Sequence, residues 1–349
     1  MTGNDVPYVR AAGDHFTIGR RHGAARAAAL RAFLDDGLGR LAHIMPTAVS
    51  MGSLSPVLSG YRTAIADAAP GLAEEIRGLA QGAGIGADEA LVLQLRREIV
   101  GYLRVGAVAA ECTTYASVDR DASVLAQTID LNGNLDDQIC VLDLSPDRGR
   151  GRVLVLSFGG LLGFVGLNAA GLAVGLNLVL GGAWGPGLPP YLAVRHLLDT
   201  AGCVEEAIRR LAGLRLASSR CITLCDPTKA AWVEVLGDQM RVFEARQTVH
   251  TNHYLHPDFA ADDEINVFAR NSSVRRLQAC RDRLAGLPAM AGPEAHFDVL
   301  AKPPICVPDE GDIRRDRTVA AVVMLPARGE LHLRPGDPSR HHTHVFALS

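Results

Sequence analysis

The chain of 349 residues is 48% hydrophobic and 21% charged, which is typical of a folded globular protein built as one large domain or two. This composition excludes a mainly disordered or fibrous protein. The 35 basic and 38 acidic residues leave a formal net charge of −3 with no long run of one sign, so we expect no nucleic-acid partner.

Apolar residues spaced by three and four predict that the first third of the chain is helical. The predicted helices are Gly19–Leu38, Gly60–Ala80 and Asp88–Leu103. The first ten residues lack a basic lead followed by an apolar stretch, so we predict no secretory signal and a cytoplasmic location. The seven cysteines are irregularly spaced, which favours reduced thiols over a disulfide framework.

From Cys112 onward the pattern changes to short β-prone runs separated by turn residues. The turn at Asn168–Gly171 predicts a hairpin, because its closing glycine adopts positive φ without steric cost. The predicted strands of this region are Thr113–Val118, Val124–Leu131, Gln138–Leu144, Val153–Phe158, Leu161–Leu167 and Leu172–Leu180.

The segment from Ser157 to Val194 contains no charged side chain, and its length is sufficient to suggest a membrane span. However, glycines and a proline cluster interrupt its apolar runs every few residues. We therefore interpret it as buried strands and expect no membrane partner.

The remainder of the chain again groups helices and strands in runs. The order predicts an α+β fold rather than a doubly wound parallel sheet, with a meander formed by three consecutive strands. The predicted elements are helix Tyr191–Leu214, meander strands Cys221–Leu224, Ala231–Leu236 and Met240–Ala245, helix Asn271–Leu284, and a final strand pair Thr318–Leu325 and Glu330–Arg334.

The change from helix to strand falls at Glu111–Tyr115, and a cysteine stands at this boundary. A thiol acts as a nucleophile in its thiolate form, and the pKa of a free cysteine is about 8.5. If Cys112 were the first residue of a chain, its α-amine, with a pKa near ~7.7 to 8.0, would act as the general base for its own side chain. This chemistry requires cleavage of the bond before Cys112.

Several motifs occur in an order that resembles the acyl-coenzyme A:6-aminopenicillanate acyltransferase family of cysteine N-terminal nucleophile (Ntn) hydrolases. The resemblance covers nearly the whole chain, and the order and spacing of its motifs are more specific than any single motif. The motifs are Gly13–Gly19, Cys112–Thr114, Ala126–Asp130, Asn168–Asn177, His250–Leu255, Asn271–Arg275, Pro304–Cys306 and Leu333–Gly336.

The resemblance implies a precursor that cuts itself between Glu111 and Cys112. The helical α-chain, residues 1–111, and the strand-rich β-chain, residues 112–349, would then remain associated in one four-layer αββα sandwich. Self-cleavage would proceed by attack of the Cys112 thiol on the preceding carbonyl, which intramolecular placement makes feasible.

The resemblance also implies the residues of the active site. Cys112 is the nucleophile, Asp130 holds the new α-amine or assists the self-cleavage, and Asn252 donates to the oxyanion of the tetrahedral intermediate. Three further residues within or next to the motifs are candidates for substrate binding: Asn177, Tyr115 and Arg275.

The sequence departs from the family pattern at two positions. Glu111 precedes the cysteine where the family usually has glycine, and Val307 follows Ile305-Cys306 where many relatives have arginine. Arg314, Arg315 and Arg317 are alternatives for the missing positive charge. The residues do not decide among these three.

The predicted activity is to break or make the amide bond of a small N-acyl metabolite or secondary-metabolite intermediate through a Cys112 thioester. Water as acceptor gives an amidohydrolase, whereas an amine acceptor or a thioester donor gives an acyltransferase, with coenzyme A allowed as co-substrate. No cofactor is expected. The alternative is an uncut, inactive relative that binds a small molecule or a partner.

Two groups of histidines raise the possibility of a metal site. His250, His253 and His256 are three apart, so on a strand they would point to opposite faces. The second group, His341, His342 and His344, stands close to the end of the chain. We therefore expect no metal.

Overall fold

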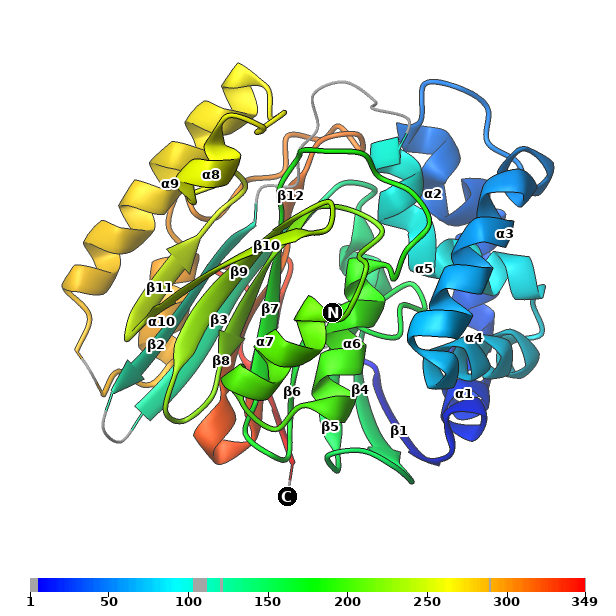
Figure 1. Cartoon of the computed structure of the whole chain (residues 1–349), viewed down its shortest axis with the longest axis horizontal. Coiled ribbons are helices and arrows are strands. Elements are labelled where there is room, and N and C mark those ends of the chain that lie inside the picture. Colours follow the sequence, from blue (N-terminus) through cyan, green and yellow to red (C-terminus); the bar gives the residue numbers. More distant parts are fainter. Residues whose placement is uncertain (1–5, 103–111, 120–121, 289, 349) are drawn as a thin grey trace.

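The computed structural model of the chain describes residues 6–102, 112–119, 122–288 and 290–348. Its helices and strands form four layers, with two β-sheets packed face to face between layers of helices (Figure 1). This arrangement confirms the α+β class and the αββα sandwich predicted from the sequence.

The first sheet has eight strands, and all neighbours in it are antiparallel except β1 and β4, which are parallel. Strands β8 to β10 form an antiparallel meander, as the turn residues predict. The strands in spatial order are β1 (Tyr8–Gly13), β4 (Ile139–Pro146), β5 (Val153–Phe158), β6 (Val165–Asn168), β7 (Ala173–Leu178), β8 (Arg220–Cys225), β9 (Ala230–Leu236) and β10 (Gln239–Ala245).

The second sheet has six strands and is antiparallel throughout. Its centre is the hairpin of β2 and β3, which begins directly after Cys112. The strands in spatial order are β11 (Gln247–His250), β2 (Thr113–Asp119), β3 (Ala122–Leu131), β12 (Arg317–Leu325), β13 (Glu330–Pro335) and β14 (His344–Ala347).

The two sheets are joined by a polar contact as well as by apolar packing. Gln127 of β3 donates from Nε2 to the Leu176 carbonyl at 2.7 Å and accepts from the Leu176 amide at 3.0 Å. Gly175 leaves room for this side chain, since a Cβ there would lie 2.8 Å from the Gln127 Oε1 atom. The amide thereby fixes how β3 lies across β7.

Helices cover the outer face of each sheet. Helices α6 and α7 pack on the first sheet, and α9 and α10 pack on the second. Their bounds are α6 (Pro190–Thr200), α7 (Val204–Ala212), α9 (Val267–Ala285) and α10 (Pro293–Leu300), with the short α8 (Pro257–Ala260) before α9.

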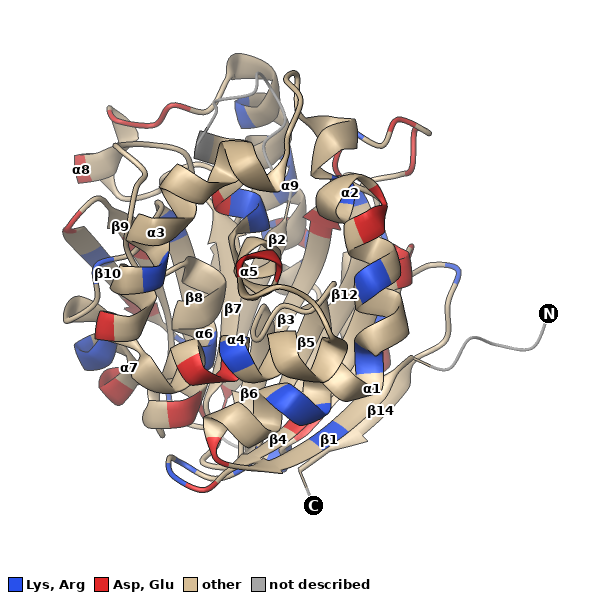
Figure 2. Cartoon of the chain, turned by 90° about the vertical axis from the view of Figure 1, so that its right-hand side faces the viewer, with Lys and Arg blue, Asp and Glu red and all other residues tan. Residues whose placement is uncertain are grey.

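Five further helices form the N-terminal part of the outer layer. Helix α5 is flanked by α2, α3 and α4, as the turned view shows (Figure 2). The bounds of this group are α1 (His15–Asp35), α2 (Gly37–Ile44), α3 (Met51–Ala68), α4 (Pro70–Ala83) and α5 (Ala87–Tyr102).

Helices α1 and α4 approach each other until their backbones touch. A Cβ at Gly19 would lie 2.0 Å from the Glu75 carbonyl oxygen, and a Cβ at Gly78 would lie 2.1 Å from the Phe16 carbonyl oxygen. Only glycine fits at such a distance. The contact therefore depends on glycines of both helices.

The structure corrects the predicted boundaries at two helices. Gly60–Ala80 is divided between α3 and α4, because Pro70 begins a new helix after Ala69. Tyr191–Leu214 is divided between α6 and α7, whose boundary falls at Ala201–Cys203. The predicted hairpin at Asn168–Gly171 is confirmed, with Gly171 at a φ of +92°.

Candidate active site

Cys112 lies at the open end of the β2–β3 hairpin. Thr113 pairs with Thr128 in the antiparallel register, which brings Cys112 beside Asp130, eighteen residues later in the chain. The Asp130 amide donates to the Cys112 Sγ atom at 3.4 Å. The thiol is buried, with 3% of the residue exposed.

The carboxylate of Asp130 is held by two threonine hydroxyls. Thr318 donates to Oδ1 at 2.6 Å and Thr128 to Oδ2 at 3.3 Å. The Thr318 hydroxyl in turn accepts from the Val307 amide at 2.9 Å. The Val307 backbone therefore supports Asp130 through this threonine.

Two side chains from different layers converge on the carbonyl oxygen of Cys112. Asn177, at the end of β7, donates from Nδ2 at 3.1 Å, and Arg276 of α9 donates from Nη1 at 2.7 Å. The same Arg276 nitrogen lies 3.1 Å from the Thr113 hydroxyl. The backbone of Cys112 is thus fixed from the first sheet and from the helix layer behind the second.

Asn252 lies in the same network through its side chain. Its Oδ1 atom accepts from Arg276 Nη2 at 2.9 Å, and its Nδ2 atom donates to the Leu178 carbonyl at 2.9 Å. An amide nitrogen carries two N–H groups, so this bond occupies one of them. The other N–H is the group that would donate to an oxyanion.

The loop that carries Asn252 is held by Glu234 of β9. Its carboxylate lies 2.8 Å from His250 Nε2, and it accepts from the backbone amides of Leu255 and His256 at 2.6 and 3.1 Å. The Asn252 amide also donates to the Ser273 hydroxyl at 2.8 Å. These bonds fix the loop at both ends.

Burial raises the pKa of the Cys112 thiol to about 12, and the nearby carboxylates of Asp130 and Asp316 act in the same direction. The Asp130 amide and the Arg276 guanidinium oppose this shift but do not cancel it. The side chain of the uncut chain is therefore a neutral thiol at pH 7.

The structure brings together Cys112, Asp130, Asn177 and Asn252, but it does not bring Tyr115 or Arg275 to them. Tyr115 points to the other side of the second sheet, where its hydroxyl lies 2.9 Å from His296 Nδ1. The Arg275 side chain is exposed on α9. Glu111, the other residue of the predicted cleavage site, lies outside the described residues.

Arg276 is the residue of this network that sequence reasoning missed. It follows Ser273 by three residues and precedes Cys280 by four, and all three are buried. This is the spacing of one helix face. Helical periodicity would therefore have favoured Arg276 over its neighbour.

The three arginines considered as replacements at position 307 are engaged elsewhere. Arg314 and Arg315 are exposed and pair with Asp312 and Glu310. Arg317 is held by three side chains, Asp136, Asp309 and Asn134.

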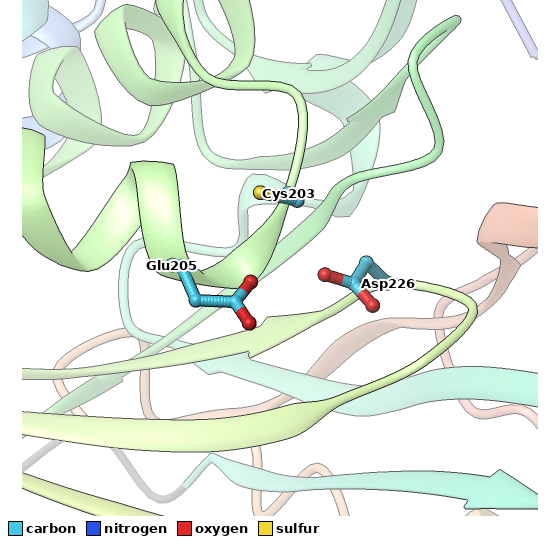
Figure 3. A group of neighbouring side chains, drawn as sticks. All are labelled: Cys203, Glu205 and Asp226. Atoms are coloured by element: carbon cyan, nitrogen blue, oxygen red, sulfur yellow. The ribbon is translucent and has the colours of Figure 1, made fainter.

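The histidines of the two sequence groups do not converge on a common point within the described part of the chain. The one cluster of metal-ligating type among the described residues is Cys203, Glu205 and Asp226 at the start of α7 (Figure 3). Its carboxylates are already engaged: Lys229 Nζ lies 2.6 Å from Glu205, and Asp226 accepts from the Val204 amide at 2.8 Å. We assign this cluster a capping role for the helix.

None of the helices, over the residues that the structure describes, combines the length and the apolar character that a membrane crossing needs.

Comparisons with known proteins give a consistent result. The sequence model of the acyl-coenzyme A:6-aminopenicillanic acid acyl-transferase family matches residues 118–340, a range that includes Asp130 and Asn252 and begins after Cys112. The 40 kDa form of the acyl-coenzyme A:6-aminopenicillanic-acid-acyltransferase of Emericella nidulans is 27% identical over 266 residues, which are 74% of this chain and 72% of that protein.

Two solved structures are similar to this chain at low sequence identity. A variant of the conjugated bile acid hydrolase from Clostridium perfringens has a TM-score of 0.51 and 11% identity, and the match covers 68% of this chain and 92% of that one. The penicillin V acylase from Agrobacterium tumefaciens has a TM-score of 0.49 and 15% identity, over 68% and 86% of the two chains.

Proposed function

The chain belongs to the acyl-coenzyme A:6-aminopenicillanic acid acyl-transferase family, and from this premise we propose that it is a self-processing cysteine Ntn enzyme that acts on a small N-acyl compound. The observation that carries the proposal is the network at Cys112. Asn177 and Arg276 hold its carbonyl, while Asp130 and Asn252 lie within the same set of hydrogen bonds.

Self-processing begins at the bond between Glu111 and Cys112. The Cys112 sulfur attacks the preceding carbonyl carbon, the peptide C–N bond breaks, and the acyl group moves from nitrogen to sulfur while the nitrogen takes up the thiol proton. Water then hydrolyses the thioester. The products are a carboxylate at residue 111 and a free α-amine and thiol on Cys112.

The new α-amine supplies the base that the buried thiol lacks. It accepts the thiol proton, the thiolate attacks the carbonyl carbon of the amide substrate, and the second N–H of Asn252 Nδ2 donates to the oxyanion. The amine of the substrate leaves with the proton, and an acyl thioester remains on Cys112. Water or an acceptor amine then attacks this thioester and restores the thiol.

The first experiment is intact-mass analysis of the purified wild-type chain beside Cys112→Ala. We expect two fragments, residues 1–111 and 112–349, from the wild type and one full-length chain from the variant. Cys280→Ala is the matched control, because Cys280 is also a buried thiol but belongs to α9 and packs in a separate hydrophobic core with Tyr115. This control should be cut like the wild type.

The second experiment measures the acyl intermediate and its acceptor. A thiol-reactive acyl probe should label Cys112 in the cut protein, and a panel of N-acyl amines and acyl thioesters should show whether water or an amine takes the acyl group. A wild-type chain that stays uncut and forms no adduct would contradict the proposal. That result would favour an inactive relative that binds a small molecule or a partner.

A further inference from the structure

Two consecutive arginines of α5 each have a buried guanidinium nitrogen without a hydrogen-bond partner. Arg96 donates from Nε to the Gly39 carbonyl at 2.8 Å, but its buried Nη2 atom has no hydrogen-bond partner. Arg97 is 8% exposed, and its buried Nε atom has no partner either. Within the described residues, neither guanidinium lies within 4.0 Å of a carboxylate oxygen.

This arrangement differs from that of other buried arginines in the chain. Arg195 contacts the carboxylates of Glu75 and Asp199, and Arg220 contacts Glu98. A buried guanidinium without an anion is energetically costly, and native proteins rarely leave buried donors unsatisfied. An unpaired pair of this kind indicates that an anion from outside the chain completes the site.

The two arginines line a narrow cavity with apolar and aromatic walls. Its volume is about 30 Å³, which gives room for about two to three atoms of the size of a water molecule. A carboxylate group is of this size. The cavity walls include Phe33, Phe158, Phe164, Tyr191, Leu131 and Asn132.

The cavity lies close to the nucleophile. Leu131 and Asn132 directly follow Asp130, whose amide donates to the Cys112 sulfur. The charge of Asp316 acts to raise the pKa of both Cys112 and Arg96. In the same way, a negative charge on Cys112 acts to raise the pKa of Tyr191 in the cavity wall. A ligand group in this cavity would therefore be within the electrostatic surroundings of the reacting sulfur.

The backbone makes room for the first guanidinium. Gly133 adopts a φ of +85°, and a Cβ at this position would lie 2.2 Å from Arg96 Nη2. Glycine thus permits the guanidinium to pack against the chain three residues after Asp130. Burial without a close anion also lowers the pKa of Arg96 to about 10.

We propose that Arg96 and Arg97 form a carboxylate-binding subsite close to Cys112, so that the amide substrate carries an acidic group. Guanidinium groups bind carboxylates through paired, charge-assisted hydrogen bonds. This inference rests on the proposed function for its reaction, but the anion site itself is tested without turnover.

The test is equilibrium binding, by titration calorimetry, of two matched pairs of probes. The pairs are formate with formamide, and acetate with acetamide, because these groups match the size of the cavity. Wild-type protein and Cys112→Ala should bind each acid more tightly than its neutral amide. Inorganic phosphate is the third kind of probe, because a phosphate of a thioester donor would carry the same charge.

Arg96→Gln and Arg97→Gln should each weaken binding of the acids by about 10- to 100-fold and leave binding of the amides unchanged. Arg77→Gln is the control, because Arg77 is exposed on α4 and pairs with Glu74. Arg97→Lys keeps the positive charge but lacks the planar guanidinium group. It should bind the acids more tightly than Arg97→Gln does, which would show that the loss in Arg97→Gln comes from the missing charge and not from damage to the fold.

Wild-type protein that binds acid and amide equally would overturn the subsite, as would tighter binding of phosphate than of the acids. These outcomes are independent of the proposed function. A chain that stays uncut but prefers the acids supports the subsite and contradicts the enzyme. A chain that cuts itself and shows no preference contradicts the subsite alone.

Discussion

Two buried polar clusters of the molecule use arginine in different ways. Between α4 and α6, Arg195 contacts Glu75 at 2.7 Å and Asp199 at 3.0 Å, and His15 adds a further contact to Glu75. Burial alone would raise the pKa of Glu75, but Arg195 and His15 outweigh it and hold this pKa below its usual value.

At the Cys112 end, Arg276 donates instead to the Cys112 carbonyl and to the Asn252 amide oxygen. The donors there are aimed at the backbone of one residue, beside a neutral thiol. The two clusters therefore show two roles of buried polar side chains. Ion pairs that neutralise each other join the N-terminal helices to α6, whereas donors directed at a carbonyl hold a backbone in place for chemistry.

The largest effect that tests this comparison is expected on stability, from Glu75→Ala. Removing Glu75 leaves Arg195 buried with one carboxylate fewer, so the free energy of unfolding should fall by about 3–5 kcal/mol. Urea unfolding measures this free energy. Glu74→Ala is the control, because Glu74 is exposed and should change stability by less than about 0.5 kcal/mol. Equal losses in both variants would contradict the structural role.

The second effect is expected on catalysis, from Asn252→Ala. Loss of an oxyanion donor should reduce kcat by about 10²- to 10³-fold. The turnover rate of a substrate identified in the panel of N-acyl amines and acyl thioesters measures this loss of kcat, and urea unfolding measures the stability of the variant. Asn271→Ala on the exposed face of α9 is the control and should retain wild-type turnover. A kcat unchanged in Asn252→Ala would remove the oxyanion role.

The third prediction concerns pH and the N-terminal helices. Burial lowers the pKa of His22 to about 4 from 6.5. The unfolded state therefore binds more protons between these values, and the contribution of His22 to stability is present above pH 6.5 and is lost as pH falls toward 4. At about 1.4 kcal/mol per pKa unit, this loss is about 3 kcal/mol.

The variant His22→Phe removes this titration. The difference in unfolding free energy between wild type and variant should shift by about 3 kcal/mol in favour of the variant between pH 6.5 and 4. The exposed His342→Gln is the control and should follow the wild type. Parallel curves for His22→Phe and the wild type would contradict the prediction.

The smallest effect is expected from Gly78→Ala at the contact of α1 and α4. The added methyl group meets the Phe16 carbonyl oxygen, so the helices must separate and stability should fall by about 1–3 kcal/mol. Thermal and urea unfolding measure this. In Gly52→Ala, the control on α3, the new Cβ would lie 3.8 Å from the Ser50 Oγ atom, an ordinary contact, and stability should stay the same or rise slightly.

The sequence predicted much of the fold because its signals are local. The spacing of apolar residues located α1 and α5, and the turn at Asn168–Gly171 located the hairpin. Strand β1 was missed, because its partner β4 lies more than one hundred residues away and no local pattern indicates this parallel pairing. Edge strands β11 and β14 are four residues long and carry little signal of their own.

The same limit applies to the candidate site. Resemblance to a family singled out Cys112, Asp130, Asn177 and Asn252, which the structure brings together. It selected Arg275, although the helix face places the next residue at Cys112, and it included Tyr115, whose side chain belongs to the opposite face of its strand.

The sequence by itself determined the order of helical and strand segments and the position of a cysteine at their boundary, because periodicity and turn chemistry act over a few residues. Tertiary structure alone decided that Asn177 of one sheet and Arg276 of the far helix layer meet on one carbonyl oxygen. It also decided that, among the described residues, Arg96 and Arg97 each keep a buried guanidinium nitrogen without a hydrogen-bond partner. Both depend on how distant segments pack, and a pattern of neighbouring residues does not contain that information.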